Sequence, residues 1–319
     1  MMQNRPVTEI SVVIPVYGCR SCLPELHARL QRTLSACAAS HEIVFVDDGS
    51  PDGSWPVLEQ LAQGDGNVKA IRLSRNFGQH AAITAGLEHT RGDWIVVMDC
   101  DLQDPPEGIP RLLEAARSGY DIVLARRTGR RHSFFRRLSA YAFSVLMKMF
   151  NRALFDWSYG SFSAISRKVA DEFVKLRERD RHYLFVLQWL GFRTTSIEYA
   201  HAERLEGESS YTVGKLVKHA FDGIFFQTTV LLRWIVYLGF LVSLSGVLLA
   251  AYFIYDYFTR SIYPGWTSIV VLTLVIGGFI ITSTGIAGLY IGKIFDQVKQ
   301  RPLYVVDRVV DRVSPREPN

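Results

Sequence analysis

Residues 92–107 read GDWIVVMDCDLQDPPE and contain the strand around which the rest of the chain is organised. The apolar run from Ile95 to Met98 has no helical period, which is typical of a short strand buried on both faces. Acids follow this run, and Pro105 and Pro106 prevent a regular ladder from continuing. Ligands of open α/β sheets bind beyond the carboxyl ends of the strands, so we expect a crevice at this point.

The acids after this strand predict a metal site. In an extended chain, Asp99, Asp101 and Gln103 lie on one side. Three oxygen donors suit a hard divalent cation, Mg2+ or Mn2+, that takes the rest of its coordination shell from water and phosphate. A short Asp-X-Asp run also fits a plain polar turn after a core strand, so the prediction depends on the other motifs.

Three further strands precede this one and bring polar residues to the same edge of the sheet. We predict them over residues 10–16, 43–46 and 68–73, with helices over about 23–39 and 81–89. Strands that alternate with helical patterns indicate an α/β fold with a mostly parallel sheet and flanking helices. Asp47 and Asp48 follow the second strand, where they either cap the next helix or accept hydrogen bonds from the base or ribose of a nucleotide.

The sequence contains neither G-x-G-x-x-G nor G-x-x-x-x-G-K-[ST], so it has no dinucleotide fingerprint and no P-loop. Nucleotide phosphates would therefore be held by a metal ion and by basic side chains. The 319-residue chain has a net charge of +5 and a pI near 9.0. The basic excess lies in residues 126–152 and after Lys293, which favours phosphorylated ligands and an anionic bilayer over nucleic acid.

The cysteines predict a reducing compartment. Cys19 and Cys22 form a single C-x-x-C without a second pair, and Cys37 and Cys100 lie on elements expected to be buried. We therefore expect reduced thiols and a cytosolic catalytic domain. Residues 1–9 are polar and do not resemble a signal peptide.

The last third of the chain predicts a membrane hairpin. Two uncharged stretches, at about 233–255 and 267–291, are each long enough to cross about 30 Å of hydrocarbon. Basic residues flank both outer ends, so both termini are expected in the cytoplasm of a multi-pass inner (plasma) membrane protein. Residues 132–152 and 212–228 carry apolar residues at helical spacing with basic flanks, which indicates amphipathic helices at the bilayer surface. An ordinary core helix remains an alternative for residues 132–152.

Four motifs occur in an order and spacing that resemble a known family: SVVIPVYG, EIVFVDDGSPDGS, RLSRNFGQHAAITAGL and GDWIVVMDCDLQDPP. The chain resembles family 2 glycosyltransferases with the GT-A fold, and more narrowly the polyprenyl-phosphate glycosyltransferases. These include dolichol-phosphate mannose synthase, the bactoprenol glucosyltransferases and the undecaprenyl-phosphate formamido-arabinose transferase. RLEGESSY at 204–211 and GLYIGKIFDQVKQRPLYVV at 288–306 extend the likeness over most of the chain.

The resemblance implies roles for particular residues. Pro15, Tyr17 and Asp47, with Asp48 nearby, resemble the pocket for the nucleotide base. The acids Asp99 and Asp101 and the amide Gln103 resemble the metal ligands, and Arg204 with the segment Ser209 to Tyr211 resembles the stretch that closes over the phosphates. Two positions depart from the family pattern. Ser210 stands where the family often has a lysine or arginine, and Ser158 stands where it often has an aspartate, which leaves Asp156 as the nearest acid.

The expected reaction is inverting transfer of a sugar from a nucleotide-diphosphate sugar, with uridine favoured, to undecaprenyl phosphate. A phosphate monoester has a second pKa of about 6, so the acceptor is already an anionic nucleophile and needs no strong base. Arginines bind such oxygens through two parallel hydrogen bonds, and Arg126 or Arg127, followed by Arg131, are the candidates.

The predicted parts are a catalytic domain over 1–211, an amphipathic helix over 212–228, the hairpin over 229–292 and a cytoplasmic tail over 293–319. Paired hairpins suggest a homo-oligomer. One rival reading is a processive polysaccharide synthase, but its Q-x-x-R-W motif is incomplete because Val230 stands three residues before Arg233 and Trp234. The other is a non-catalytic, membrane-tethered nucleotide-sugar binding protein.

Overall fold

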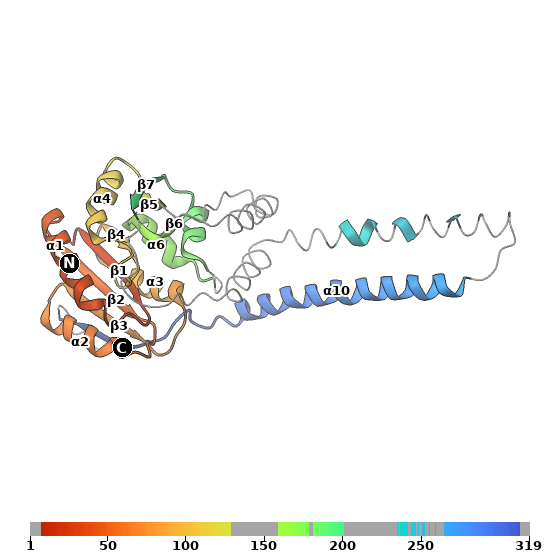
Figure 1. The fold of residues 1–319 in the computed structure, drawn as a ribbon, viewed down its shortest axis with the longest axis horizontal. Helices are drawn as coiled ribbons and strands as arrows, with labels where there is room; N and C mark the ends of the chain where they lie inside the picture. The colour runs from red at the N-terminus through yellow and green to blue at the C-terminus, as the bar shows by residue number, and fades with distance from the viewer. Residues whose placement is uncertain are drawn as a thin grey trace, which may run out of the picture. The chain divides into compact units, whose positions relative to one another are not determined.

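The structure is a computed structural model that describes residues 8–128, 159–178, 181–200 and 265–312, together with isolated positions between 235 and 259. The chain divides into two compact units. One comprises residues 1–132, 155–208 and 301–319, and the other comprises residues 133–154 and 209–300. The first unit contains the sheet that Figure 1 shows.

The described residues form an eight-stranded sheet in the order β7-β5-β6-β4-β1-β2-β3-β8. The strands are β1 (Ile10–Val16), β2 (His41–Asp47), β3 (Val68–Leu73), β4 (Trp94–Val97), β5 (Ile122–Thr128), β6 (Tyr159–Ser166), β7 (Thr194–Ala200) and β8 (Val306–Asp311). Strands β1 to β4, β5 and β7 run in one direction, and β6 and β8 are antiparallel to them. The predicted mostly parallel sheet is confirmed.

Helices cover both faces of this sheet (Figure 1). One face carries α1 (Leu23–Cys37), α2 (Ser54–Gly64) and α4 (Ile109–Arg117), and the other carries α3 (Gln79–Glu88), α6 (Arg167–Lys175) and α7 (Tyr183–Leu190). The apolar run of β1 serves both layers, because Val12 and Ile14 join the core under α1 while Val13 joins the core under α3. This is why the strands read as continuous apolar runs.

Only the first four strands were predicted, and β5 to β8 were not. Residues 293–319 read as a polar tail, but β8 pairs antiparallel with β3, and Ser74 N donates to Val305 O at 2.9 Å where the two meet. Charged residues such as Asp307 and Arg308 suit an edge strand, where they discourage pairing with a further chain. The sequence after residue 301 therefore belongs to the catalytic unit.

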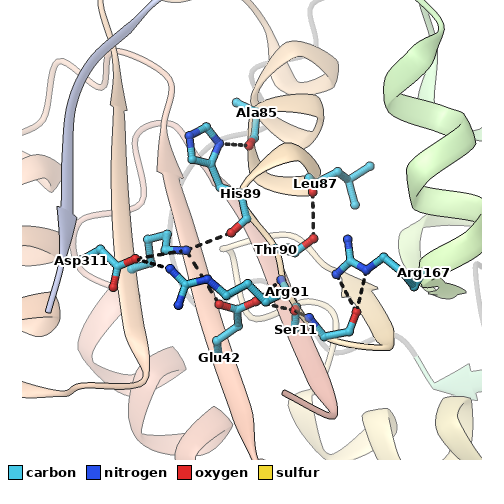
Figure 2. Close-up of polar contacts among 11 residues, drawn as sticks. Ser11, Glu42, Ala85, Leu87, His89, Thr90, Arg91, Arg167 and Asp311 are labelled. Atoms are coloured by element: carbon cyan, nitrogen blue, oxygen red, sulfur yellow. Dashed lines mark hydrogen bonds and ion pairs between the residues drawn. The ribbon is translucent and has the colours of Figure 1, made fainter. Parts of the chain in front are cut away.

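A buried charge cluster fastens β8 at the edge where the parallel strands begin, which we call the amino edge. Lys69 Nζ lies 3.3 Å from Asp311 Oδ2 and 3.8 Å from Glu42 Oε2, and it donates to His89 O at 2.9 Å. Figure 2 shows Glu42, Arg91 and Asp311 converging there, with Arg91 Nη2 3.1 Å from Asp311. Ser11 Oγ donates to Glu42 at 2.7 Å, so β1, β2, β3 and β8 are tied together.

The second unit contains α10 (Trp266–Val298), which matches the predicted span at 267–291 at its start and continues further. Within it, Val275–Val298 is long and apolar enough to cross a membrane by length and composition. The predicted span at about 233–255 is described only in part, and the described positions, which include 237–241 and 244–246, are helical. The predicted amphipathic helices at 132–152 and 212–228 lie outside them entirely.

Candidate active site

One edge of the sheet gathers the polar loops. Because β1 to β4 are parallel and β5 and β7 run in the same direction, their carboxyl ends share this edge, which we call the carboxyl edge. The antiparallel strand β6 begins there. The loops after β2, β3 and β4 and the first residues of β6 therefore lie around the same space, as expected for ligand binding in an α/β sheet.

The loop after β4 bends instead of continuing extended. Leu102 has a φ of 60°, and Asp101 Oδ1 accepts a hydrogen bond from Gln103 N at 3.2 Å. The expectation of an extended path is therefore wrong, because the side chain of Asp101 closes a local turn. Exposure nevertheless alternates, since Asp99, Asp101 and Gln103 are partly exposed. The residues between and beside them are buried: Met98, Cys100, Leu102 and Asp104.

Two side chains from other elements hold Asp99. Gln79 Nε2, at the first position of α3, donates to Asp99 Oδ1 at 2.7 Å. Ser161 Oγ, in β6, donates to the same oxygen at 2.7 Å. Neither residue was a candidate from the sequence. The only signal was that Gln79 ends the motif RNFGQ, within a segment already assigned to the family pattern.

Asp48 organises the loop that carries Gln79. Its two carboxylate oxygens accept hydrogen bonds from Phe77 N at 2.7 Å and Gly78 N at 2.8 Å, and the residue is 2% exposed. Burial raises the pKa of Asp48, and these two hydrogen bonds oppose the rise. Through these contacts Asp48 holds the loop after β2 against the loop after β3. A contact between Asp48 and a nucleotide stays a prediction.

Gly49 permits the close approach of those loops. Its φ is +68°, and a Cβ at this position would lie 2.8 Å from the backbone carbonyl carbon of Arg75 and from Asn76 N. A side chain there is excluded both by the conformation and by the neighbouring backbone. Asp48 and Gly49 therefore explain the motif DDG, because the acid binds the amides of the RNFG segment and the glycine lets the backbone of that segment come close.

The residues of the predicted base pocket differ in accessibility. Tyr17 is 54% exposed, Pro15 is buried in β1, and Asp47 is 1% exposed. Asp47 Oδ1 accepts from Ser50 N at 3.0 Å, and Oδ2 lies 3.9 Å from Arg72 Nε without a hydrogen-bond partner among the described residues. Burial raises the pKa of Asp47. Tyr17 can meet a ligand directly, whereas Asp47 becomes available only if the groups that cover it shift.

The third carboxylate of the loop after β4 is fully buried. Asp104 has no exposed surface, and Tyr199 in β7 donates its hydroxyl to Asp104 Oδ1. Tyr199 also packs edge-on against Phe162 of β6, with ring centroids 5.5 Å apart. These contacts attach the end of the loop to β6 and β7, which limits the positions that Asp99 and Asp101 can take.

The predicted acceptor residues lie at the end of β5. Arg126 pairs across the sheet with Tyr159 and Glu198, and its Nη1 lies 3.8 Å from Glu198 Oε1 on a half-exposed surface. Arg127 follows it opposite Tyr199. The other predicted or discussed positions lie outside the described residues: Arg131, Asp156, Ser158, Arg204, Ser209, Ser210 and Tyr211.

The cysteines differ from the prediction of four reduced thiols. Cys19, in the turn after β1, and Cys100, between Asp99 and Asp101, form a disulfide with their Cα atoms 6.3 Å apart. Neighbouring strands β1 and β4 bring the two turns together, which the 81-residue separation hid in the sequence. Cys22 and Cys37 are free thiols.

The donor set fits a hard divalent cation. Asp99 and Asp101 supply carboxylate oxygens and Gln103 an amide oxygen, all partly exposed, which is the chemistry that Mg2+ and Mn2+ prefer. The described residues contain no group of three or more histidine, cysteine and acidic side chains able to hold a metal by themselves. Such a cation would therefore depend on water and on the oxygens of a bound ligand for the rest of its coordination.

Known proteins are similar over nearly the whole chain. An "Uncharacterized glycosyltransferase YkcC" from Bacillus subtilis (strain 168) is 37% identical over 302 residues, covering 94% of each protein. The "Undecaprenyl-phosphate 4-deoxy-4-formamido-L-arabinose transferase" of Pseudomonas fluorescens (strain SBW25) is 38% identical over 328 residues, covering 99% of this chain and 94% of that one.

Among solved structures, glucosyl-3-phosphoglycerate synthase from Mycobacterium tuberculosis, in complex with Mn2+, UDP and phosphoglyceric acid, gives a TM-score of 0.49 at 16% identity. It covers 68% of this chain and 76% of that one. The model of glycosyl transferase family 2 matches residues 11–188, and with the full-length relatives it shows that this chain is a glycosyltransferase of that family.

Proposed function

We propose that the protein transfers a sugar from a nucleotide-diphosphate sugar to a polyprenyl phosphate, such as undecaprenyl phosphate, at the cytoplasmic face of the membrane. The observation that carries the proposal is the loop after β4, where Asp99 and Asp101 are partly exposed at the carboxyl edge while their neighbours are buried. Relatives at 36–38% identity are named as undecaprenyl-phosphate transferases, which supports the lipid acceptor.

The donor would bind along the carboxyl edge. Tyr17 offers an exposed ring for the nucleobase, uracil by our proposal, and Asp47 offers a carboxylate next to it once its cover shifts. Asp99, Asp101 and Gln103 would hold Mg2+ or Mn2+ against the diphosphate. When bound, such an ion stabilises the negative charge of the departing nucleoside diphosphate. The residues of the chain have to present these oxygens in a fixed arrangement.

The acceptor would meet the arginines at the end of β5. Arg126 is half-exposed and its contact with Glu198 spans 3.8 Å between exposed side chains, which is a weak pair that a phosphate can displace. Arg127 and Arg131 continue the basic run. Because a phosphate monoester is already anionic near pH 7, these residues need only bind and orient it, and direct displacement of the diphosphate inverts the anomeric centre.

The position of β8 supports the two-span topology. Residues 306–311 pair with β3, so they lie on the same side of a membrane as the sheet. A chain that leaves and returns to one side crosses an even number of times. If α10 crosses, a second crossing has to lie between residues 201 and 264, where the sequence places the span at about 233–255. The basic flanks put the sheet and both termini in the cytoplasm.

A transfer assay tests the proposed reaction. Purified full-length protein in detergent is incubated with undecaprenyl phosphate, Mn2+ and radiolabelled UDP-sugars, and the organic-extractable label is counted. We expect label in the lipid fraction with at least one UDP-sugar, released by mild acid. Binding without transfer for every nucleotide sugar that raises the melting temperature would favour a non-catalytic protein, and label in a high-molecular-weight polymer would favour a processive synthase.

A further inference from the structure

We infer that Gln79 and Ser161 are positioning residues for Asp99, which set the carboxylate for a divalent cation before the cation arrives. The inference rests on the proposed function, because it assigns these two residues to the metal step of the donor site. It stands on two hydrogen bonds of 2.7 Å from separate elements to one oxygen, Asp99 Oδ1.

Two donors on one oxygen define the orientation of the carboxylate group. Gln79 approaches from the amino end of α3 and Ser161 approaches from β6, the strand next to β4. Rotation of the Asp99 side chain would break both hydrogen bonds at once, so the direction of Oδ2 is set by the direction of Oδ1. Groups of this kind around metal ligands typically change metal affinity by about 10- to 100-fold when they are removed.

The chemistry of the donors suits this role. An amide and a hydroxyl are neutral, so they orient Asp99 without cancelling its charge. An arginine or lysine in either place would form a charge-assisted pair with the carboxylate and would repel an incoming cation. Gln79 and Ser161 therefore fix the geometry of Asp99 without themselves neutralising its charge.

Neighbouring residues hold the backbone at both donors in place. Gly78, just before Gln79, has a φ of +99°, and its N–H donates to Asp48, so the β2 loop determines where α3 begins. Ser161 lies two residues before Ser163 in β6, and the Ser163 hydroxyl donates to Ser161 O at 2.9 Å. The same hydroxyl lies 2.9 Å from the hydroxyl of the buried Tyr183. The motifs DDG and RNFGQ are thus linked to Asp99, in the loop after β4, through a series of hydrogen bonds.

The test measures metal binding directly on the full-length protein in detergent. Free Mn2+ is followed by electron paramagnetic resonance, with and without UDP, for the wild type and for Gln79→Leu, Ser161→Ala and the double variant. We expect the dissociation constant for Mn2+ to rise about 10-fold or more in each single variant and further in the double variant. Ser161→Thr keeps the hydroxyl and should restore most of the affinity.

Matched controls separate positioning from general damage. Gln63→Leu on α2 and Ser118→Ala at the C-cap of α4 make the same chemical changes at exposed positions away from the carboxyl edge, and they should bind Mn2+ like the wild type. In the transfer assay, the Mn2+ concentration for half-maximal rate should rise in the Gln79 and Ser161 variants, while KM for undecaprenyl phosphate stays the same.

Two outcomes would overturn the inference and distinguish it from the proposed function. If Asp99→Asn and Asp101→Asn abolish Mn2+ binding while Gln79→Leu and Ser161→Ala keep wild-type affinity, the metal site stands and the positioning role fails. If Asp101→Asn itself binds Mn2+ with wild-type affinity, the metal assignment fails, and the positioning role fails with it.

Discussion

At the amino edge, Lys69 lies 3.3 and 3.8 Å from two carboxylates, and all three groups are largely buried. At the carboxyl edge, Asp99 receives two hydrogen bonds from neutral donors and remains partly exposed. The first arrangement cancels charge and fastens a strand. In the second, the two neutral donors orient a carboxylate and do not themselves cancel its charge, as a ligand for a cation requires in our proposal. Similar residue types therefore serve structure at one edge and, in our proposal, chemistry at the other.

The sharpest way to break this comparison is to neutralise one acid at the carboxyl edge. Asp101→Asn keeps the shape and the oxygen that accepts from Gln103 N, but removes the charge that a cation requires. We expect the transfer rate to fall by about 1000-fold or more, since the charge of the departing diphosphate loses its main stabilisation. The melting temperature should stay close to that of the wild type.

Retention of most of the transfer activity in Asp101→Asn would remove the metal assignment. Organic-extractable label in initial-rate assays measures the activity, and thermal unfolding of the same preparation measures the stability.

The opposite result is expected at the amino edge. Lys69→Met removes the buried cation between Glu42 and Asp311 and leaves the more exposed Arg91, 3.1 Å from Asp311, at the cluster. Breaking a buried pair in this way costs about 3–5 kcal/mol of stability. The melting temperature should fall by several degrees, whereas the transfer rate per folded molecule at low temperature should change less than about twofold, because no group at the carboxyl edge is altered.

The exposed residue Lys168, on α6, provides a control for Lys69. Lys168→Met removes a charge from a surface pair with Asp121 at 3.6 Å and should change stability by less than about 1 kcal/mol. Equal losses in the two variants would show that burial of the amino-edge cluster has no energetic consequence.

The disulfide is a covalent, structural contact at the carboxyl edge, where it joins the loop after β1 to the loop after β4. Closing an 81-residue separation contributes about 2–4 kcal/mol in typical cases. Cys19→Ser should therefore lower the melting temperature measured without reductant and should leave that measured in reductant unchanged. Titration of the unfolded, unreduced wild type should find two thiols, Cys22 and Cys37. Four thiols would show that the purified protein is reduced, as the sequence suggested.

The smallest effect concerns the buried acid Asp47. Burial raises its pKa in the folded protein above the ordinary value of 3.8, so between these two pKa values the folded state binds more protons than the unfolded state. Ionisation of this group then costs stability, and its contribution makes the protein less stable as pH rises through that window. Asp47→Asn should remove this dependence, because the amide does not titrate.

Thermal unfolding of the wild type and of Asp47→Asn between pH 4 and pH 7 measures this term. The difference in melting temperature between the two proteins should shift in favour of Asp47→Asn as the pH rises. A constant difference across the range would show that the pKa of Asp47 is not raised.

The sheet could be predicted from the sequence because its signals are local. The apolar runs Ile10–Val16 and Val68–Leu73 have the bounds that were predicted, and the acids that follow β2 and β4 indicated the ligand edge. Two of the differences from the prediction have clear physical reasons. Strand β8 is an edge strand rich in charge, so it reads like a solvated tail. Helix α3 begins at Gln79 rather than at Ala81, because Asp48 holds the preceding amides from another loop.

The sequence by itself determined the fold class, the family and the acids Asp99 and Asp101, since each depends on residues close together in the chain. Only the tertiary structure decided which side chains those acids meet. Gln79 and Ser161 lie 20 and 62 positions from Asp99, and Cys19 lies 81 positions from Cys100. Such contacts follow from the strand order, which places β6 and β1 on either side of β4. A local pattern contains no information about that order.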